Sequence, residues 1–558
     1  MFDVLLDEVP PVGSNIPTGS SENSWLFVLP TLAPDHALCL GPATPQLRAQ
    51  LEANARTVTF VDGLAGREGG DPRPVDLLVA AGAAFERITA IDAELAELRR
   101  LLADGAHLVV HTLGARSEDV ASQLARLVDI PTHPLTLDPA AGQGDGSAPV
   151  SGNVLFITGQ LPANAGPVLV RRFRKLFILL SSRVARTLGR NNPTTAARVH
   201  ASDLRPMRPI HGEQGKRSQA ILVGPPGAEL GRPPRWVRDL CRQAGLEVAN
   251  DRWAFAPPRG YRSQKPLFLL HDTDGAPFVL KLTQEPEFNG RLLNEASALT
   301  TIVEQRLVDP ASVPQVRFAG SYGGLAVVLE TAWEGQPFRA LSTADPTCPF
   351  AARAVEWFTA LGERSAVPAR NNDALHRGAT RLVERYVDTF APPAGHLAGL
   401  TSALKRLRGR AAPTVFYHGD PGNWNLMSRA DGSIGVLDWE NAKPAGPPGW
   451  DLLLFLKTFG TFVAEASGYR YTSSTFAEQF APGSPMRELI DPSLLAYARR
   501  IRVEVDVLEV LILLCWVHQA LKDASRLTSG TLASSHYRQV TEHCLENPVL
   551  LTVPDSSR

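Results

Sequence analysis

Short apolar runs alternate with helical patterns in the first part of the chain. Between residues 37 and 112 the runs ALCLG, TVTFVD, DLLVAAG and HLVVHT are separated by segments such as PQLRAQLEANA and ELAELRRLLADG. Strand, helix and strand recurring at this spacing predict βαβ units, whose strands form a parallel sheet. We therefore expect an α/β domain with a parallel sheet over residues 1–165.

A different pattern follows in the second half. The run LFLLHDTDGAPFVLKL (267–282) predicts a β-hairpin with its turn at Asp274-Gly275, and residues 290–306 have a helical pattern. VRFAGSY and GLAVVLETA predict another strand pair, after which helical patterns dominate. A small antiparallel sheet followed by a mostly helical body predicts a bilobal α+β unit, with a small lobe at 221–335 and a helical lobe at 336–558.

The segment between these domains, 166–220, is strongly basic. From Arg171 to Arg217 it holds twelve Lys or Arg against two Asp or Glu, and FRKLFILLSSRVARTL has an apolar stripe flanked by cations. Two interpretations stay open. The helix at 171–190 contacts an anionic membrane surface, or it bridges two domains and its arginines are solvated.

Composition narrows the class of protein. Hydrophobic residues make up 44% and charged residues 20% of the 558 residues, which is typical of a soluble globular protein. The net charge of −1 gives no support for nucleic-acid binding. Five dispersed cysteines without a CxxC pair favour a reducing compartment, and no apolar run reaches the roughly 20 residues of a membrane-spanning helix. We expect a cytoplasmic protein.

The stretch VFYHGDPGNWNLMSRADGSIGVLDWE (415–440) carries the strongest chemical signal. Its second part predicts a hairpin with Asp431-Gly432 in the turn, which brings Asp438 back toward the loop that carries Asp420 and Asn425. Mg²⁺ prefers oxygen ligands and is usually held by one or two carboxylates together with substrate phosphates. Asn425 and Asp438 suit this role, and Asp420 is then left to deprotonate a hydroxyl group.

This pattern, His-Gly-Asp-x4-Asn followed by Asp-Trp-Glu, resembles the aminoglycoside phosphotransferase and choline kinase-like family of the protein-kinase-like fold. The resemblance covers about residues 250–545. It implies that Asp420 is the catalytic base, that Asn425 and Asp438 bind Mg²⁺, and that His418 and Asp451 support the catalytic loop.

The same resemblance implies an ATP or GTP site in the small lobe. Lys281 in FVLKL and Glu295 in RLLNEASAL correspond to the strand lysine and helix glutamate of kinases. The segment 257–268 corresponds to the phosphate-covering loop but has one glycine, so Ser263 and Gln264 are its candidate phosphate contacts. The hinge that binds a purine is expected at Glu330 to Trp333.

Twelve residues separate Asp438 from Asp451, too few for the segment on which protein kinases dock peptides. We therefore expect a small-molecule hydroxyl acceptor, such as a sugar or polyol of a glycoconjugate or natural-product pathway. Two alternatives stay open: a nucleotide-binding pseudokinase that acts as a scaffold, and a bifunctional methyltransferase and kinase.

The second alternative arises because HALCLGPATPQLRAQLEANARTVTFVD resembles the first βαβ unit of class I methyltransferases, which have a Rossmann-like fold and use S-adenosylmethionine (SAM). Gly41 corresponds to a glycine of the cofactor loop and Asp62 to the acid that binds the ribose. Ala43 and Pro45 replace two further glycines, and their side chains obstruct a close backbone approach. A degenerate domain that serves as a scaffold is therefore the competing interpretation.

Overall fold

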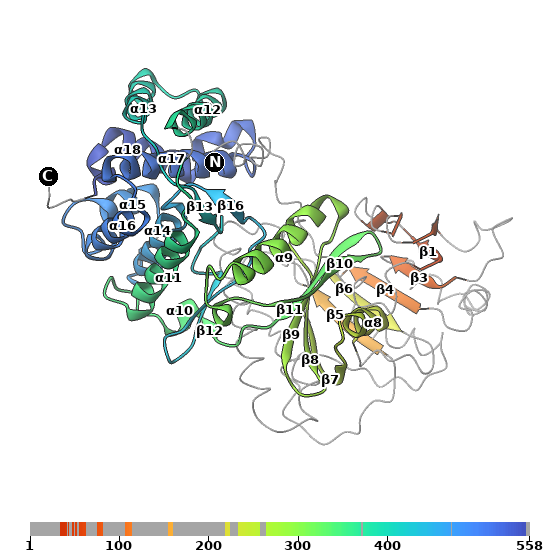
Figure 1. Ribbon diagram of the computed structural model, residues 1–558. Helices are drawn as coiled ribbons and strands as arrows, with labels where there is room; N and C mark the ends of the chain where they lie inside the picture. Colours follow the sequence, from red (N-terminus) through yellow and green to blue (C-terminus); the bar gives the residue numbers. More distant parts are fainter. Residues whose placement is uncertain are drawn as a thin grey trace.

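A computed structural model of the chain has an N-terminal sheet, a five-stranded lobe and a helical lobe (Figure 1). It describes residues 34–41, 43, 47–48, 51–52, 55–62, 75–81, 107–113, 154–159, 218–223, 233–256, 264–369, 372–469 and 471–553. The basic segment 171–190, with its two interpretations, lies outside the described residues.

The N-terminal sheet has the strand order β2-β1-β3-β4-β6-β5. Its strands are β1 (His36–Leu40), β2 (Thr57–Val61), β3 (Leu77–Ala81), β4 (His107–Leu113), β5 (Val154–Gly159) and β6 (Ser218–Val223). The pairs β1/β2, β1/β3 and β3/β4 are parallel, whereas β6 is antiparallel to both β4 and β5. Residue 221, at which the sequence predicts the start of the small lobe, lies within β6. The next described helix begins at Arg235.

In its described residues, the five-stranded lobe has one antiparallel sheet, two α-helices and two short 3-10 helices. Its elements are α8 (Arg235–Gln243), β7 (Val248–Ala256), β8 (Leu267–Asp272), β9 (Pro277–Leu282), η3 (Pro286–Phe288), α9 (Asn289–Glu304), η4 (Pro310–Ser312), β10 (Val316–Tyr322) and β11 (Leu325–Thr331). The strand order is β10-β11-β9-β8-β7, and the predicted hairpin is β8/β9, with Gly275 at a φ of 90° in its turn. Only glycine adopts this φ at low cost, so the sequence specifies the turn locally.

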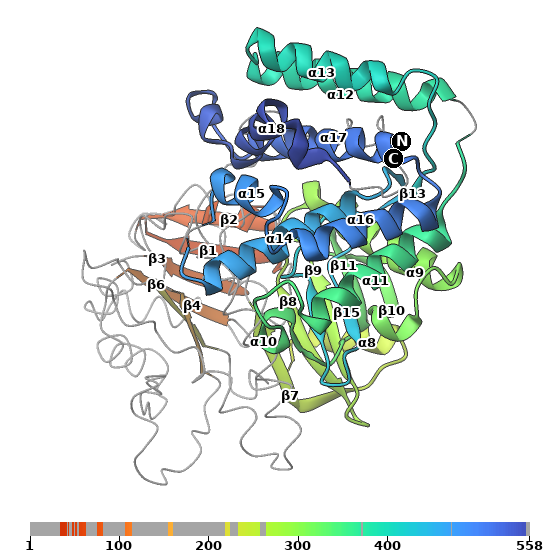
Figure 2. The ribbon, with the colours of Figure 1, turned by 90° about the vertical axis from the view of Figure 1, so that its left-hand side faces the viewer.

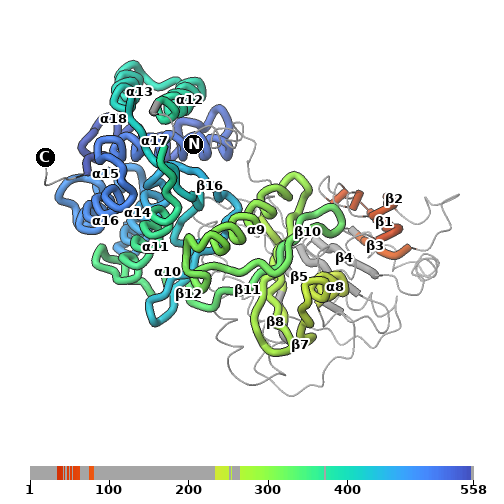
Figure 3. Tube along the Cα trace, in the orientation of Figure 1, coloured from red at the N-terminus to blue at the C-terminus, as the bar shows by residue number. Residues whose placement is uncertain are grey.

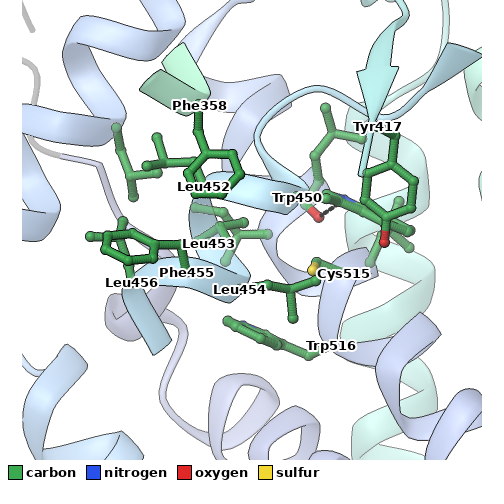
Figure 4. Packing of buried hydrophobic residues seen from close by; sticks show 14 of the residues in the cluster. Phe358, Tyr417, Trp450, Leu452, Leu453, Leu454, Phe455, Leu456, Cys515 and Trp516 are labelled. Carbon is green, nitrogen blue, oxygen red and sulfur yellow. Dashed lines mark hydrogen bonds between the residues drawn. The ribbon is translucent and has the colours of Figure 1, made fainter. Parts of the chain in front are cut away.

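The helical lobe is built around two helices that are apolar on most of their surface. Helix α14 (Trp450–Ala466) and helix α17 (Val505–Ala524) are buried along most of their length, as expected for helices without a polar face. Figure 4 shows Trp450 of α14 close to Cys515 of α17, and Leu454 of α14 close to Cys515 and Trp516. The indole Nε1 of Trp450 donates a hydrogen bond to the carbonyl of Leu511 at 2.8 Å, which satisfies its buried polar atom.

The remaining helices surround this core. They are α10 (Phe338–Leu341), α11 (Pro349–Ser365), α12 (Asn372–Phe390), α13 (Ala394–Arg406), α15 (Ser473–Phe480), α16 (Arg487–Ile501), η5 (Ser529–Ser534), α18 (His536–Glu546) and η6 (Pro548–Leu551). Figure 2 shows α12 and α13 side by side at the outer edge of the lobe. The short strands β12 (Gln336–Pro337), β14 (Leu426–Ser428) and β15 (Ile434–Val436) form one sheet, and β13 (Val415–Tyr417) pairs with β16 (Lys443–Gly446). The two small sheets carry the loops of the candidate site.

Helix α8 lies in the apolar contact between the N-terminal sheet and the five-stranded lobe (Figure 3). Trp236 packs edge-on against Phe268 of β8 with ring centroids 5.4 Å apart and stacks on Tyr322 of β10. Cys39 and Val79 of the N-terminal sheet belong to the same buried cluster. The two sheets therefore share one core, although the sequence predicts them as separate domains.

No helix within the described residues combines the length and the apolar character needed to cross a membrane.

Replacing Trp236 with alanine should lower the free energy of unfolding by about 3–5 kcal/mol, because it leaves a cavity between the two sheets. Urea unfolding followed by circular dichroism would measure the loss. The control is Tyr469→Ala, whose ring is 69% exposed and should cost little. A loss at residue 236 no larger than that of the control would show that the shared core is not a cooperative unit.

Candidate active site

The loop that follows β13 is held in place by one buried carboxylate. Asp451, in the first turn of α14, accepts hydrogen bonds from the backbone N–H groups of His418 at 2.6 Å and Gly419 at 3.1 Å. Burial raises the pKa of Asp451 to about 6, while the cationic and N–H partners oppose this rise. At neutral pH the charged carboxylate thus fixes the backbone immediately before Asp420.

His418 is buried beneath the segment that follows β15. Its Nε2 lies 3.0 Å from the carbonyl oxygen of Leu437, and its ring packs against Trp439 with centroids 4.5 Å apart. These contacts tie the loop at 418–420 to the end of β15. The geometry is that of a support for the loop, the role that the resemblance implies.

Asp420 lies at the end of this loop with one oxygen directed by neighbouring donors. Asn425 Nδ2 donates to the Asp420 carbonyl at 2.8 Å and to its Oδ2 at 3.2 Å, and Trp424 Nε1 lies 3.4 Å from the same Oδ2. Lys522 of α17 donates to the adjacent Gly419 carbonyl at 3.2 Å. The carboxylate is therefore oriented by two donors of the loop before β14, and Lys522 of α17 holds the backbone beside it.

The β14/β15 hairpin brings Asn425 and Asp438 together. Leu426, the first residue of β14, pairs with Val436, the last residue of β15. The N–H of Leu437 donates to the Asn425 carbonyl at 2.9 Å. Asn425 and Asp438 therefore lie at the same end of the hairpin. Asp438 has a φ of 65°, a conformation that is uncommon for a residue other than glycine. Such backbone outliers cluster at functional sites.

On the small lobe, Lys281 of β9 lies between two buried carboxylates. Its Nζ is 2.6 Å from Glu295 Oε1 on α9 and 2.6 Å from Glu330 Oε1 on β11. The Lys281–Glu295 pair has the geometry that the sequence indicates. Burial alone would lower the pKa of Lys281, but the two carboxylates outweigh it and raise that pKa.

Glu330, the first residue of the expected purine-binding hinge at Glu330 to Trp333, is the sixth residue of β11. The backbone of Glu330 pairs with Val316 of β10 on one side and with Val279 of β9 on the other. Its carboxylate contacts Lys281. A residue enclosed by two strands has its backbone groups in the ladder, so they are not free for a nucleotide. In a hinge of this kind, the backbone groups that could contact a purine would be those after the end of β11.

A second lysine at the site, Lys265, was not predicted. Its Nζ lies 2.8 Å from Asp438 Oδ1, 3.0 Å from Glu295 Oε2 and 2.9 Å from Glu440 Oε2. It thereby joins the small lobe to the hairpin of the helical lobe. Burial would raise the pKa of Asp438, but Lys265 and Lys281 hold it well below its usual range.

The other predicted residues are placed as follows. Gln264 accepts a hydrogen bond from Gln284 Nε2 through its backbone carbonyl, at 2.7 Å, and Ser263 lies outside the described residues. Gly41 follows β1 with a φ of 87°, and its N–H donates to the carbonyl of Val61 at 2.8 Å. Asp62 is exposed directly after β2. Gly41 and Asp62 are therefore neighbours at the same sheet edge.

The donor set at Asn425 and Asp438 fits a magnesium ion that is shared with phosphates. Asn425 uses its NH₂ group on Asp420, which turns its amide oxygen away from that carboxylate. Within the part of the chain that the structure describes, no group of three His, Cys, Asp or Glu side chains is arranged to hold a metal. One carboxylate and one amide would therefore need phosphate oxygens to complete an octahedral shell.

Comparison with known protein families gives a match to one region of the chain. Residues 258–480 match the model of the phosphotransferase enzyme family, APH. The kinase-like fold expected for the C-terminal half is confirmed by this match, which includes every candidate site residue from Gln264 to Asp451. The chain as a whole matches none of the curated proteins with which it was compared.

Two solved structures illustrate the similarity. The macrolide 2'-phosphotransferase MphH from Brachybacterium faecium is 17% identical, with 57% of this chain and 99% of that chain covered and a TM-score of 0.35. The aminoglycoside phosphotransferase APH(3'')-Id from Streptomyces rimosus, in complex with ADP and streptomycin, is 18% identical. Its match covers 47% of this chain and 91% of that chain, with a TM-score of 0.28.

Sequence reasoning missed Lys265, Glu440 and Lys522. Lys265 precedes β8 in the irregular loop SQKPLF, where no motif marks it. Glu440 is part of the Asp-Trp-Glu signature, and its place beside Asp438 could have indicated a charged role. Lys522 lies about 100 residues from Asp420 in an apolar helix, and a cation in such a helix was the available signal.

Glu330→Gln should change how stability depends on pH. Burial raises the pKa of Glu330 from 4.5 to about 7, so the folded protein holds this proton more tightly than the unfolded chain. The resulting stabilisation is complete below about pH 4.5 and is lost as the pH rises through 7. Relative to the wild type, Glu330→Gln should therefore gain about 3 kcal/mol between pH 5 and pH 8.

Urea unfolding at several pH values would measure this difference. Glu334→Gln is the matched control, because Glu334 is exposed beyond the end of β11. A difference between wild type and Glu330→Gln that does not vary with pH would show that Glu330 has an ordinary pKa.

Proposed function

We propose that this protein transfers the γ-phosphoryl group of ATP or GTP to a hydroxyl group of a small molecule, with Mg²⁺. The observation that carries the proposal is the convergence of two groups of residues from opposite lobes. The Lys281–Glu295 pair of the small lobe and the Asp420, Asn425 and Asp438 cluster are joined through Lys265. The family match over 258–480 supports the same reaction class.

Asp420 is the proposed catalytic base. Its Oδ2 is engaged by Asn425 and Trp424, so the other oxygen is directed to accept the proton of an acceptor hydroxyl. Asp451 and His418 keep this carboxylate in position through the loop backbone. Asp420 thus holds the nucleophile in place and removes its proton as the new P–O bond forms.

Lys281 and the metal ligands serve the phosphates in this proposal. Lys281 presents its ammonium at a position fixed by Glu295 and Glu330, and it would neutralise phosphate oxygens of the nucleotide. Asn425 and Asp438 would hold Mg²⁺, which supplies further charge neutralisation when it is bound. Catalysis then depends mainly on positioning and electrostatic stabilisation.

The short connection between the hairpin and α14 favours a small acceptor. After Asp438 the chain forms β16 and reaches α14 at Trp450, which leaves little polypeptide on which a peptide substrate could dock. We propose a sugar or polyol as the acceptor class. The cytoplasm is the proposed location.

Asp420→Asn should reduce the rate of phosphoryl transfer by about 100- to 10,000-fold, because the amide cannot accept the hydroxyl proton. Nucleotide affinity should stay close to that of the wild type, since Asp420 is assigned to the acceptor. Coupled ADP-release assays and calorimetric titration with nucleotide measure the two effects. The control is Asp431→Asn in the exposed turn of the same hairpin. Wild-type turnover in Asp420→Asn would remove Asp420 as the base.

A scaffold that binds nucleotide without catalysis is the competing function. The single glycine in the phosphate-covering segment 257–268 favours it, whereas the assembled set of Lys281, Asp420 and Asp438 favours an enzyme. Incubation of the wild type with ATP and a panel of sugars, polyols and amines, followed by mass spectrometry, separates the two. We expect a product heavier by one phosphoryl group. Nucleotide binding without any such product would support the scaffold.

The N-terminal sheet is proposed to be a degenerate methyltransferase-like domain. Strand β1 lies between β2 and β3, so the connections that leave β1 and β2 run in opposite directions along the sheet. Ligands of open α/β sheets bind at the carboxyl ends of the strands where the direction changes in this way. Gly41 and Asp62 both lie at this edge. Calorimetric titration with SAM tests the bifunctional alternative, and heat of binding that is lost in Asp62→Ala would support it.

A further inference from the structure

We propose that Lys265 is an internal counter-cation of the metal site, which competes with a divalent cation for the Asp438 carboxylate and so sets the affinity of the site for metal. This inference rests on the proposed function in one respect, namely that Asp438 is a metal ligand. It adds a residue that neither the kinase signature nor the roles assigned above include.

The contacts of Lys265 are those of a cation in a coordination site. Three carboxylates lie 2.8–3.0 Å from Nζ. One belongs to Glu295 of α9, and the other two are at the two ends of the Asp-Trp-Glu segment. The lysine side chain is 11% exposed. An ammonium has three donors, so Asp438, Glu295 and Glu440 satisfy all of them.

The backbone around Lys265 is fixed to the sheet while its side chain is long and flexible. The carbonyl of Gln264 accepts from Gln284 Nε2 at 2.7 Å, and the carbonyl of Pro266 accepts from the N–H of Leu282 at 3.2 Å. A lysine side chain has four methylene groups, so its ammonium can leave Asp438 without movement of these backbone anchors. Release of the carboxylate thus requires only a change of side-chain rotamer.

The charges at the site explain why Lys265 and a metal exclude one another. Two ammonium groups, of Lys265 and Lys281, face four carboxylates, of Glu295, Glu330, Asp438 and Glu440. Lys265 is the cation that contacts Asp438. A divalent cation on this carboxylate would lie within a few ångströms of the largely buried ammonium, and like charges at this distance repel one another.

The variant needed to test this should fold, because other contacts hold the same elements together. Asn294 of α9 donates through Nδ2 to the carbonyls of Glu440 at 3.1 Å and Ala442 at 3.0 Å. Glu295 keeps Lys281 as a partner when Lys265 is removed. The lobes therefore stay connected without the Lys265 ammonium.

The experiment is calorimetric titration of the full chain with MgCl₂ alone, without nucleotide. Lys265→Met and Lys265→Gln should bind Mg²⁺ at least about tenfold more tightly than the wild type, because each removes the competing charge. Lys265→Arg keeps the charge and should resemble the wild type. Lys405→Met, at an exposed position of α13, is the matched control. In Lys265→Met, the further change Asp438→Asn should abolish the gain.

A structural role for Lys265 would lower the melting temperature without changing Mg²⁺ affinity. Unchanged or weaker Mg²⁺ binding in folded Lys265→Met and Lys265→Gln would therefore overturn the proposal. A measurement on the wild type does not depend on a variant that folds: MgCl₂ should increase reductive methylation of Lys265, but not of Lys405, as followed by mass spectrometry. Equal labelling of Lys265 with and without saturating MgCl₂ would contradict the release of its ammonium.

These outcomes are separate from those of the proposed function. If Lys265→Met gains Mg²⁺ affinity but the wild type phosphorylates no acceptor, the inference about Lys265 stands and the phosphotransferase fails. If the wild type phosphorylates an acceptor but Mg²⁺ affinity is the same in all variants, the phosphotransferase stands and the inference fails.

Discussion

The candidate site depends on one buried carboxylate, that of Glu295. It is fully buried on α9, and each of its oxygens faces a different lysine, Lys281 on β9 and Lys265 before β8. A buried charge is strongly unfavourable unless it is paired. The ion pairs of Glu295 with Lys281 and Lys265 therefore hold α9 against the sheet. Through Lys265 the same constraint reaches Asp438, and the position of the hairpin in the helical lobe is coupled to that of α9.

The helical lobe also contains a buried carboxylate, that of Asp451, and its partners are backbone N–H groups. Asp451 lies at the start of α14, where the helix N-terminus favours a negative charge, and it accepts two N–H groups of the loop before Asp420. The loop at 418–420 is thereby fixed to a helix that is buried on most sides. Lys522 reaches the same loop from α17. Both charged partners of the loop thus come from the two helices that form the core of this lobe.

The N-terminal sheet is connected to the rest of the molecule by apolar packing. Residues of β1 and β3 share a buried cluster with Trp236 and with side chains of β8 and β11 in the five-stranded lobe. The structure gives the two units a common core, and β6 lies between β4 and β5 in the N-terminal sheet.

The sequence alone determined the local elements and the chemistry of the motifs. The β8/β9 turn at Gly275, the hairpin after Asn425 and the short His-Gly-Asp segment follow from residue preferences over a few positions, and these predict where Asp420 and Asp438 lie along the chain. Tertiary structure decided which charges meet. Lys265, Glu330 and Lys522 carry no motif, since their partners lie up to 173 positions away and ion pairing depends on distance in space. The joining of the two sheets through α8 was likewise decided by packing, because an apolar helix face does not specify which surface covers it.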